Sequence, residues 1–326
     1  MLRYLCRRIL YLIGVFFVVS ILMFFLYKLI PGDPVRMMLD TAKASTDPER
    51  YQIMYEAARK QLGLDRPLVI QYLSWMGKML RGDFGYSSAY HMEVIDLVGV
   101  PLKNTLLLNV CAFILVFAIS IPIGIFTAVK KYSMFDQIVQ VLSVVGYSLP
   151  TFIVALLFIH LLAVKFPILP IGGMHTPGRI GTGFERWSDT LYHMILPLLV
   201  MTVSSLGGII RYIRAAMLEV LQMDYIRTAR AKGLPQRVVI YTHAFRNALI
   251  PVVTIVTSWF VSIFGGSVVI ESIFGWNGIG RVLFEALKQQ DYAVVLAMQM
   301  FYVVLSLVGN LIMDLGYCLV DPRVKL

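Results

Sequence analysis

Charged side chains are scarce in this 326-residue sequence: Asp, Glu, Lys and Arg make up 15% of it, whereas hydrophobic residues make up 58%. A soluble globular domain typically contains about 25% charged residues. The shortage of charge argues against an ordinary soluble domain, because so much apolar surface must be buried in lipid or against neighbouring helices. The composition therefore predicts an integral membrane protein.

Cysteine is also rare, and several motifs that carry chemistry are missing. The three cysteines (Cys6, Cys111 and Cys318) have no metal-binding or redox spacing, and each lies in or beside an apolar segment, so we interpret them as small packing residues. The sequence contains no G-x-x-x-x-G-K-[ST], no H-E-x-x-H and no G-x-S-x-G. We therefore expect no catalytic residue, metal or bound cofactor in this chain, and any ATP must be bound by a partner.

Positive charge exceeds negative charge, with 29 Lys and Arg against 19 Asp and Glu. A net charge of +10 can indicate nucleic-acid binding. Here the cations lie at the ends of apolar runs, which favours a role in membrane topology. We expect the lipid bilayer as a partner, and no nucleic acid.

Six uncharged runs are each about as long as the 20 residues that a membrane-spanning helix needs. They are residues 9–27, 104–129, 137–164, 190–210, 247–270 and 292–313. Period-2 alternation is absent, which excludes a β-barrel. The first run is longer than a signal-peptide core and has no small-residue cleavage site. The sequence thus predicts an all-α integral membrane protein with six transmembrane helices, the first of them uncleaved.

The cations also predict the orientation of these spans, because short cytoplasmic loops are enriched in Lys and Arg. Three arginines precede the first run, Lys130 and Lys131 follow the second, and seven cations lie between Arg211 and Asn247. We therefore expect both termini in the cytoplasm.

Residues 31–103 form the one long polar segment, which falls on the outer side in this topology. Asp47-Pro48 predicts the start of a short helix and Gly63 its end. A second amphipathic piece is expected over residues 68–80. These short helices are expected on or near the outer face, and the sequence leaves open whether one of them is embedded in the membrane.

The most informative stretch is a basic, polar island at residues 223–251, MDYIRTARAKGLPQRVVIYTHAFRNALIP. Asp224 can cap a helix over residues 225–232, and Gly233 can end it. Pro235 then suits the first turn of a second helix. These features predict a structured helix–Gly–helix facing the cytoplasm. The alternative is an ordinary positively charged loop with two amphipathic pieces.

The string DYIRTARAKG resembles the cytoplasmic coupling loop, or "EAA" loop, of bacterial ABC importer permeases, in the form of the dipeptide, oligopeptide and nickel branch. Arg227 stands where the general pattern has an acid, and Gly233 matches the motif's glycine. The strings IPGDPV, QLGLDRPL, QYLSW and GDFGYS are similar to the same branch. The resemblance implies a multi-pass protein of the bacterial cytoplasmic (inner) membrane. It also implies a type I permease core of five helices at residues 94–326, preceded by an N-terminal helix and an extracytoplasmic helical segment at residues 1–93.

In that family the short helix docks into a cleft on a separate ATPase subunit. The resemblance therefore implies a coupling loop within residues 211–247 whose key positions are Asp224, Tyr225, Arg227, Thr228, Ala229, Arg230, Ala231, Lys232 and Gly233. It also implies four protein partners: a second homologous permease subunit, two ATP-binding subunits and an extracytoplasmic substrate-binding protein.

Two further places are candidate parts of the transport path. The loop after the fifth run resembles the family's outer loop, with Asn277 where a proline is usual, and its possible gate residues are Glu271, Phe274, Trp276, Asn277 and Gly278. The alternative is a plain turn whose Trp276 lies at the membrane interface. Asn310 and Asp314 share one helix face near the inner end of the last span, and either line the path or pair with a loop arginine.

The function that the resemblance implies is ATP-driven import of di- and oligopeptides by alternating access. Permeases for glutathione or nickel chelates look alike at this level, although the spans contain no His/Cys/Met cluster for bare metal. An ion-coupled secondary transporter is the alternative from another class, and paired acids within spans or repeated broken helices would favour it.

Overall fold

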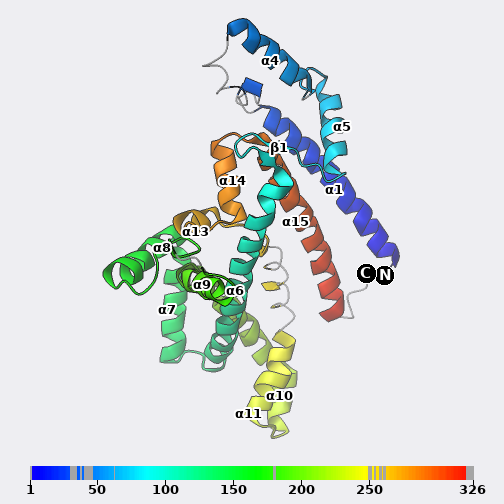
Figure 1. Ribbon diagram of the computed structural model, residues 1–326. Helices are drawn as coiled ribbons and strands as arrows, with labels where there is room; N and C mark the ends of the chain where they lie inside the picture. The colour runs from blue at the N-terminus through cyan, green and yellow to red at the C-terminus, as the bar shows by residue number, and fades with distance from the viewer. Residues whose placement is uncertain are drawn as a thin grey trace. The chain divides into compact units, whose positions relative to one another are not determined.

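The computed structural model describes residues 2–29, 35–36, 39, 47–61, 63–178, 181–248, 252, 255–256, 259 and 262–320 (Figure 1). The chain divides into two compact units. The first unit is Met1–Leu102 with Val282–Val308, and the second is Lys103–Arg281 with Gly309–Leu326. Each is described here by itself.

Helices dominate both units, which confirms the predicted all-α class. In chain order the elements are α1 (Leu2–Leu29), α4 (Pro48–Gln61), α5 (Leu68–Met79), β1 (Tyr86–Ser87), β2 (Met92–Glu93), α6 (Val94–Val129), α7 (Met134–Ser148), α8 (Thr151–Ile159), η1 (His160–Lys165), α9 (Phe184–Leu221), α10 (Asp224–Ala231), α11 (Gln236–Val238), η2 (Val239–Phe245), α13 (Val268–Ile273), α14 (Ile279–Lys288) and α15 (Tyr292–Val320). The short strands β1 and β2 pair antiparallel, with Tyr86 opposite Glu93.

Four helices of the described chain are long and apolar enough to cross a membrane: Cys6–Leu29 of α1, all of α6, all of α9, and Tyr292–Asp314 of α15. The bent pair Met134–Ser148 and Thr151–Lys165 makes a fifth if it counts as one span. Nine of the 24 residues of the predicted span over residues 247–270 lie outside the described residues. The count of six therefore stays a prediction.

One expected span is not straight. The run 137–164 was predicted as a single helix, but it bends by 101° between α7 and α8. Pro150 causes the break, because a proline disfavours helical geometry in the residue before it. Leu149 accordingly adopts an extended conformation with ψ 128°, and Pro150 precedes the first residue of α8.

In the first unit, α5 packs against α1. Phe24 of α1 contacts Tyr72 and Trp75 of α5 in a cluster that also contains Met76 and Met79. The Ser20 and Tyr72 hydroxyl oxygens lie 2.8 Å apart in a buried hydrogen bond. The two helices predicted in the polar segment are confirmed, and Gly63, with φ +68°, follows the end of α4 as expected.

In the second unit, α9 is the central helix, and α7 and α8 pack along it. A Cβ at Gly207 would overlap the Ser143 carbonyl oxygen, so this glycine permits the close approach of α7. The predicted span over residues 190–210 is too short, since α9 runs on to Leu221 through good helix formers. Its 38 residues extend about 57 Å, well beyond a hydrocarbon core of about 30 Å.

Candidate functional site: the coupling segment and the outer loop

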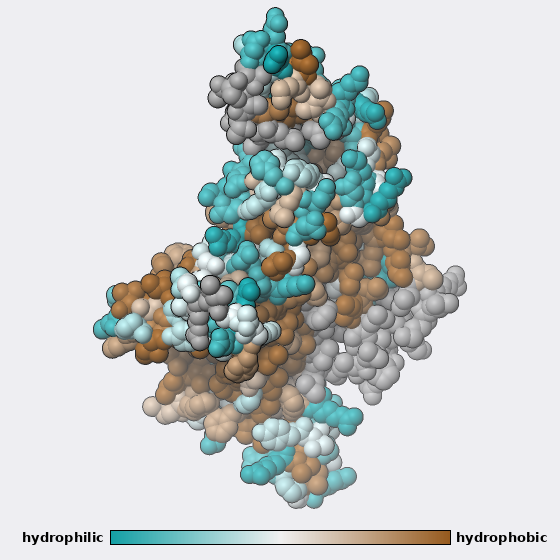
Figure 2. Space-filling model, viewed as in Figure 1, coloured by the Kyte–Doolittle hydropathy of each residue, from teal (hydrophilic) through white to brown (hydrophobic). Residues whose placement is uncertain are grey.

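The α10 helix has one buried face and one exposed face. Ile226 and Ala229, three residues apart, are 0% and 6% exposed and belong to a core that contains residues of α6, α9 and η2. The predicted coupling residues at the remaining positions are exposed: Asp224, Tyr225, Arg227, Thr228, Arg230, Ala231, Lys232 and Gly233. In Figure 2, polar side chains gather over α10 and α11. The helix therefore presents its basic side outward while two apolar residues hold it to the second unit.

The start of α10 corrects one expectation. Met223, not Asp224, is the N-cap, with ψ 147° and no side-chain capping bond, and Asp224 is the first helical residue. Its carboxylate still lies where the helix dipole favours negative charge. Arg227 Nη1 lies 3.7 Å from Asp224 Oδ1, but both side chains are largely exposed, so this ion pair contributes little to stability. The Thr228 hydroxyl donates to the Asp224 carbonyl at 3.0 Å.

The end of α10 follows the sequence prediction. Gly233 has φ +74°, and its amide donates to the Arg230 carbonyl at 2.9 Å. The Leu234 amide donates to the Ala229 carbonyl at 3.4 Å. These two bonds form a Schellman motif, in which a left-handed glycine terminates the helix. No atom lies within 4 Å of a Cβ added at Gly233, so the backbone conformation, and not crowding, requires glycine.

A second helical segment follows, which confirms the helix–Gly–helix prediction. Pro235 is the N-cap of α11 rather than a residue of its first turn, and α11 continues directly into the π-helix η2. Val239 and Ala244 of η2 are buried in the same core as Ile226 and Ala229. The α10 helix thus packs against η2, in a core that it shares with α6 and α9.

A buried ion pair lies near this segment, and sequence reasoning missed it. Arg214 of α9 binds Asp136 of α7 with both Nε and Nη2, each at 2.7 Å from a carboxylate oxygen. The side chains are 18% and 3% exposed, respectively. The Tyr132 amide also donates to Asp136 at 2.9 Å. The pair fixes the beginning of α7 to the basic end of α9. A carboxylate in the first turn of an otherwise uncharged apolar run was the available signal.

The outer loop, from Glu271 in α13 to Gly278, is held in place by hydrogen bonds to its buried residues. Glu271 is 1% exposed and accepts hydrogen bonds from the Thr105 hydroxyl at 2.8 Å and the Arg281 amide at 2.9 Å. A Cβ at Gly278 would overlap the Glu271 carboxyl group, so glycine is required there. Burial raises the pKa of Glu271, although these hydrogen bonds oppose the shift.

Two aromatic residues of this loop are also buried. Trp276 is 0% exposed, and its Nε1 donates to the Asn104 carbonyl at 3.0 Å, while the Asn104 amide donates to the Asn277 carbonyl at 2.8 Å. Phe274 packs in the same core as Trp276. The Trp276 ring is therefore packed inside the second unit.

A polar cluster fixes a neighbouring loop to α9. The buried Asp189 carboxylate accepts from the Thr176 amide at 2.8 Å and its hydroxyl at 2.7 Å, with His175 and His193 at 3.6 and 3.8 Å. The Gly173 amide donates to the Phe274 carbonyl at 2.7 Å, so this loop also touches the Glu271 loop. Within the described chain, no group of three or more His, Cys, Asp or Glu residues could hold a metal ion.

The candidate pathway residues both lie on α15. Asn310 is exposed and Asp314 is half-buried, four positions further along the same helix.

Comparison with known proteins assigns the chain to a family. Residues 120–326 match the model of the "Binding-protein-dependent transport system inner membrane component", and residues 1–93 match the model of the family's N-terminal region. The chain belongs to this family. It is therefore a multi-pass inner-membrane subunit of an ABC importer, a system that also contains ATPase subunits and a binding protein. This membership does not favour an ion-coupled secondary transporter.

Named relatives match over the whole chain. The chain is 40% identical over 326 residues to the oligopeptide transport system permease protein AppB of Bacillus subtilis, covering 100% of both chains. It is 36% identical over 343 aligned residues to the dipeptide transport system permease protein DppB of Escherichia coli, covering 100% of this chain and 99% of that one.

A solved structure supports the fold. An inward-facing MetNI methionine ABC transporter matches with a TM-score of 0.51 and 16% identity, covering 68% of this chain and 97% of the other. At that identity the match supports the importer permease fold alone.

Proposed function

We propose that this chain is the permease subunit of an importer for di- and oligopeptides. Relatives named for oligopeptide and dipeptide transport match over its full length, which favours peptides over glutathione or nickel chelates. A partner ATPase binds ATP and Mg and drives alternating access. The permease itself supplies a path and a mechanical link, and no chemistry.

In this proposal α10 is the element that receives the motion of the ATPase. Its exposed Tyr225, Arg227 and Arg230 form the contact surface, and Arg227 and Arg230 suit acidic groups on the rim of the ATPase cleft. The buried Ile226 and Ala229 pass the movement on, because a close-packed core transmits displacement instead of absorbing it. The single observation that carries the proposal is this division of an eight-residue helix into an exposed basic face and a buried apolar one.

The full importer would contain a second, homologous permease subunit, two ATP-binding subunits and an extracytoplasmic binding protein. Both termini and α10 would face the cytoplasm, as the Lys and Arg distribution favours. The Glu271–Gly278 loop would then lie at the outer mouth, where it would act as a rigid rim, since its carboxylate and both aromatic rings are buried. Asn310 and Asp314 would line the inner part of the path.

The test is charge reversal on the exposed face. In cells that lack other peptide permeases, Arg227→Glu with Arg230→Glu should weaken co-purification of the ATPase subunits in a salt-dependent way and lower dipeptide uptake. Lys60→Glu with Arg59→Glu on α4 is the matched control, because it makes the same change of charge on exposed residues elsewhere.

The outcomes test the coupling role of α10 and the assignment of peptides as substrate separately. Unchanged ATPase binding by the α10 variant, or equal loss in the α4 control, would contradict the coupling role. Uptake of a nickel chelate or glutathione but of no dipeptide would contradict the peptide assignment while leaving the coupling role intact.

A further inference from the structure

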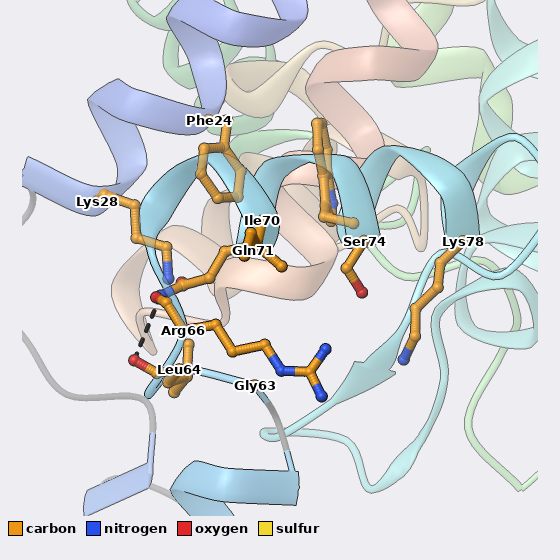
Figure 3. A pocket seen from close by; sticks show the side chains of 10 residues that line it. Phe24, Lys28, Gly63, Leu64, Arg66, Ile70, Gln71, Ser74 and Lys78 are labelled. Carbon is orange, nitrogen blue, oxygen red and sulfur yellow. Dashed lines mark hydrogen bonds between the residues drawn. The ribbon is translucent and has the colours of Figure 1, made fainter.

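An open cavity of about 180 Å³ lies in the first unit where the end of α1 meets α5 (Figure 3). Helix α1 contributes Phe24 and Lys28, and α5 contributes Ile70, Gln71, Ser74, Trp75 and Lys78; the connection before α5 contributes Gly63, Leu64 and Arg66. The cavity is not part of the coupling segment or the outer loop, so the proposed function gives it no role.

Among the described residues, the charged side chains that line this cavity are all positive. Lys28, Arg66 and Lys78 line it, and no Asp or Glu is among the lining residues that the structure describes. In Figure 3, Lys28 enters from α1 toward Gln71, and Arg66 extends toward Ser74 and Lys78. Lys78 has only a marginal ion pair, at 4.0 Å from Asp83. In the part of the chain that the structure describes, Lys28 and Arg66 have no carboxylate partner. Three like charges around one cavity favour a bound anion.

The wall also offers an unused hydrogen-bond acceptor. Gln71 Nε2 donates to the Arg66 carbonyl at 2.6 Å and to the Leu64 carbonyl at 3.3 Å, which holds the connection in place. Gln71 Oε1 is buried and has no hydrogen-bond partner. A ligand that carries a hydroxyl donor beside its anionic group would satisfy this oxygen.

The depth of the cavity places it at lipid headgroups. Lys28 is the next-to-last residue of the 24-residue candidate span Cys6–Leu29, whose length of about 36 Å matches a hydrocarbon core of about 30 Å. Phe24 lies one helical turn deeper. On α5, Leu68, Val69 and Leu73 are 46%, 64% and 62% exposed, as expected of an amphipathic helix whose apolar side chains enter the membrane surface.

We propose that this cavity binds the headgroup of an anionic phospholipid, with the phosphodiester between Lys28 and Arg66 and a headgroup hydroxyl on Gln71. The acyl chains would run over Phe24 and Ile70. The site rests on the membrane location of α1 and not on the transported substrate. With both termini in the cytoplasm, as proposed above, the site lies in the outer leaflet.

The test uses the full permease assembly in vesicles of phosphatidylcholine with a rising share of phosphatidylglycerol, and measures retained lipid by native mass spectrometry. Lys28→Gln with Arg66→Gln should weaken phosphatidylglycerol retention by roughly thirtyfold, the effect of removing two cations from an anionic surface. The control is Arg59→Gln with Lys60→Gln, which removes two exposed cations from the neighbouring α4 and should leave retention unchanged.

Four results would overturn the proposal. They are equal retention of phosphatidylcholine and phosphatidylglycerol, equal loss in the α4 control, no loss in the cavity variant, and displacement of the lipid by a soluble dipeptide or by inorganic phosphate. Gln71→Leu keeps all three cations, so it should lower retention of phosphatidylglycerol while leaving the preference for anionic over zwitterionic lipid.

Discussion

Substitution of Gly233 tests the coupling segment at its most constrained point. A leucine in the left-handed conformation that Gly233 adopts, with φ +74°, costs about 1–2 kcal/mol. Because no atom lies within 4 Å of the added Cβ, crowding contributes nothing further at that atom. The Schellman cap should therefore lose population by roughly fivefold to thirtyfold relative to other local conformations.

This loss should appear in ATPase binding. If α10 docks only when it is capped, the apparent affinity for the ATPase falls in proportion to the capped fraction. We expect Gly233→Leu to bind the ATPase more weakly, by up to about thirtyfold when the capped form becomes the minor one, and to lose dipeptide uptake. The permease pair should still assemble, since the substitution leaves the spans unchanged. Gly233→Asn is the matched variant, because asparagine tolerates this conformation, and it should keep most of the activity.

The assay combines a pull-down of the ATPase subunits with dipeptide uptake, at equal membrane levels of permease. Normal binding and uptake by Gly233→Leu would refute the reasoning, and the stretch would then be only a positively charged turn. Equal damage from Gly233→Asn and Gly233→Leu would show that backbone conformation is not the property that matters.

Three further predictions concern the second unit and the topology. Asp136→Asn should destabilise the solubilised permease by about 1.5–3 kcal/mol because it removes a charge-assisted hydrogen bond to the Arg214 guanidinium, and a melting temperature equal to wild type would contradict this. Burial raises the pKa of Glu271, so the stability that its protonation contributes is complete below the unfolded pKa and is lost as pH rises through the folded pKa. From acid to neutral pH the melting temperature should therefore fall less steeply for Glu271→Gln than for the wild type, and an unchanged slope would count against the buried carboxylate. Reporter fusions should report cytoplasm after Lys131 and the outside near Asp47, and a cytoplasmic signal near Asp47 would rule out the predicted orientation.

The coupling segment was largely predictable because its signals are local. A basic stretch between apolar runs, a glycine after eight helix-forming residues and a proline two positions later suffice to predict helix–Gly–helix. The cap at Met223 instead of Asp224 is a one-residue difference, of the size usual at helix ends. The early end of the predicted span at residue 210 has another cause: charge marks where lipid ends, but a helix continues for as long as its residues support it.

The outer loop and the ion pair were not predictable in the same way. Glu271 and Trp276 read as surface residues, and only the folded chain supplies Thr105 and Asn104, more than 160 positions away in sequence, as their partners. Asp136 and Arg214 are likewise separated by 78 positions. A single sequence carries no signal for such distant pairing. Gly278 is the one local sign that Glu271 is buried, because only glycine leaves room for the Glu271 carboxyl group.

Helix α6 connects the two candidate sites within the second unit. Its Ile125 and Ala128 belong to the core that contains Ile226 and Ala229 of α10, whereas its Thr105 binds Glu271 of the outer loop. About 20 residues of continuous helix separate these contacts, a distance of about 30 Å. A helix of this length moves largely as a rigid element, so a displacement of α10 that shifts the inner end of α6 also shifts its outer end. The hydrogen bond between Glu271 and Thr105 then favours concerted movement of the loop with α6, because breaking it would leave a buried polar group with one partner fewer. If α10 receives the motion of the ATPase as proposed, this helix would link it to the outer loop, which is what alternating access requires.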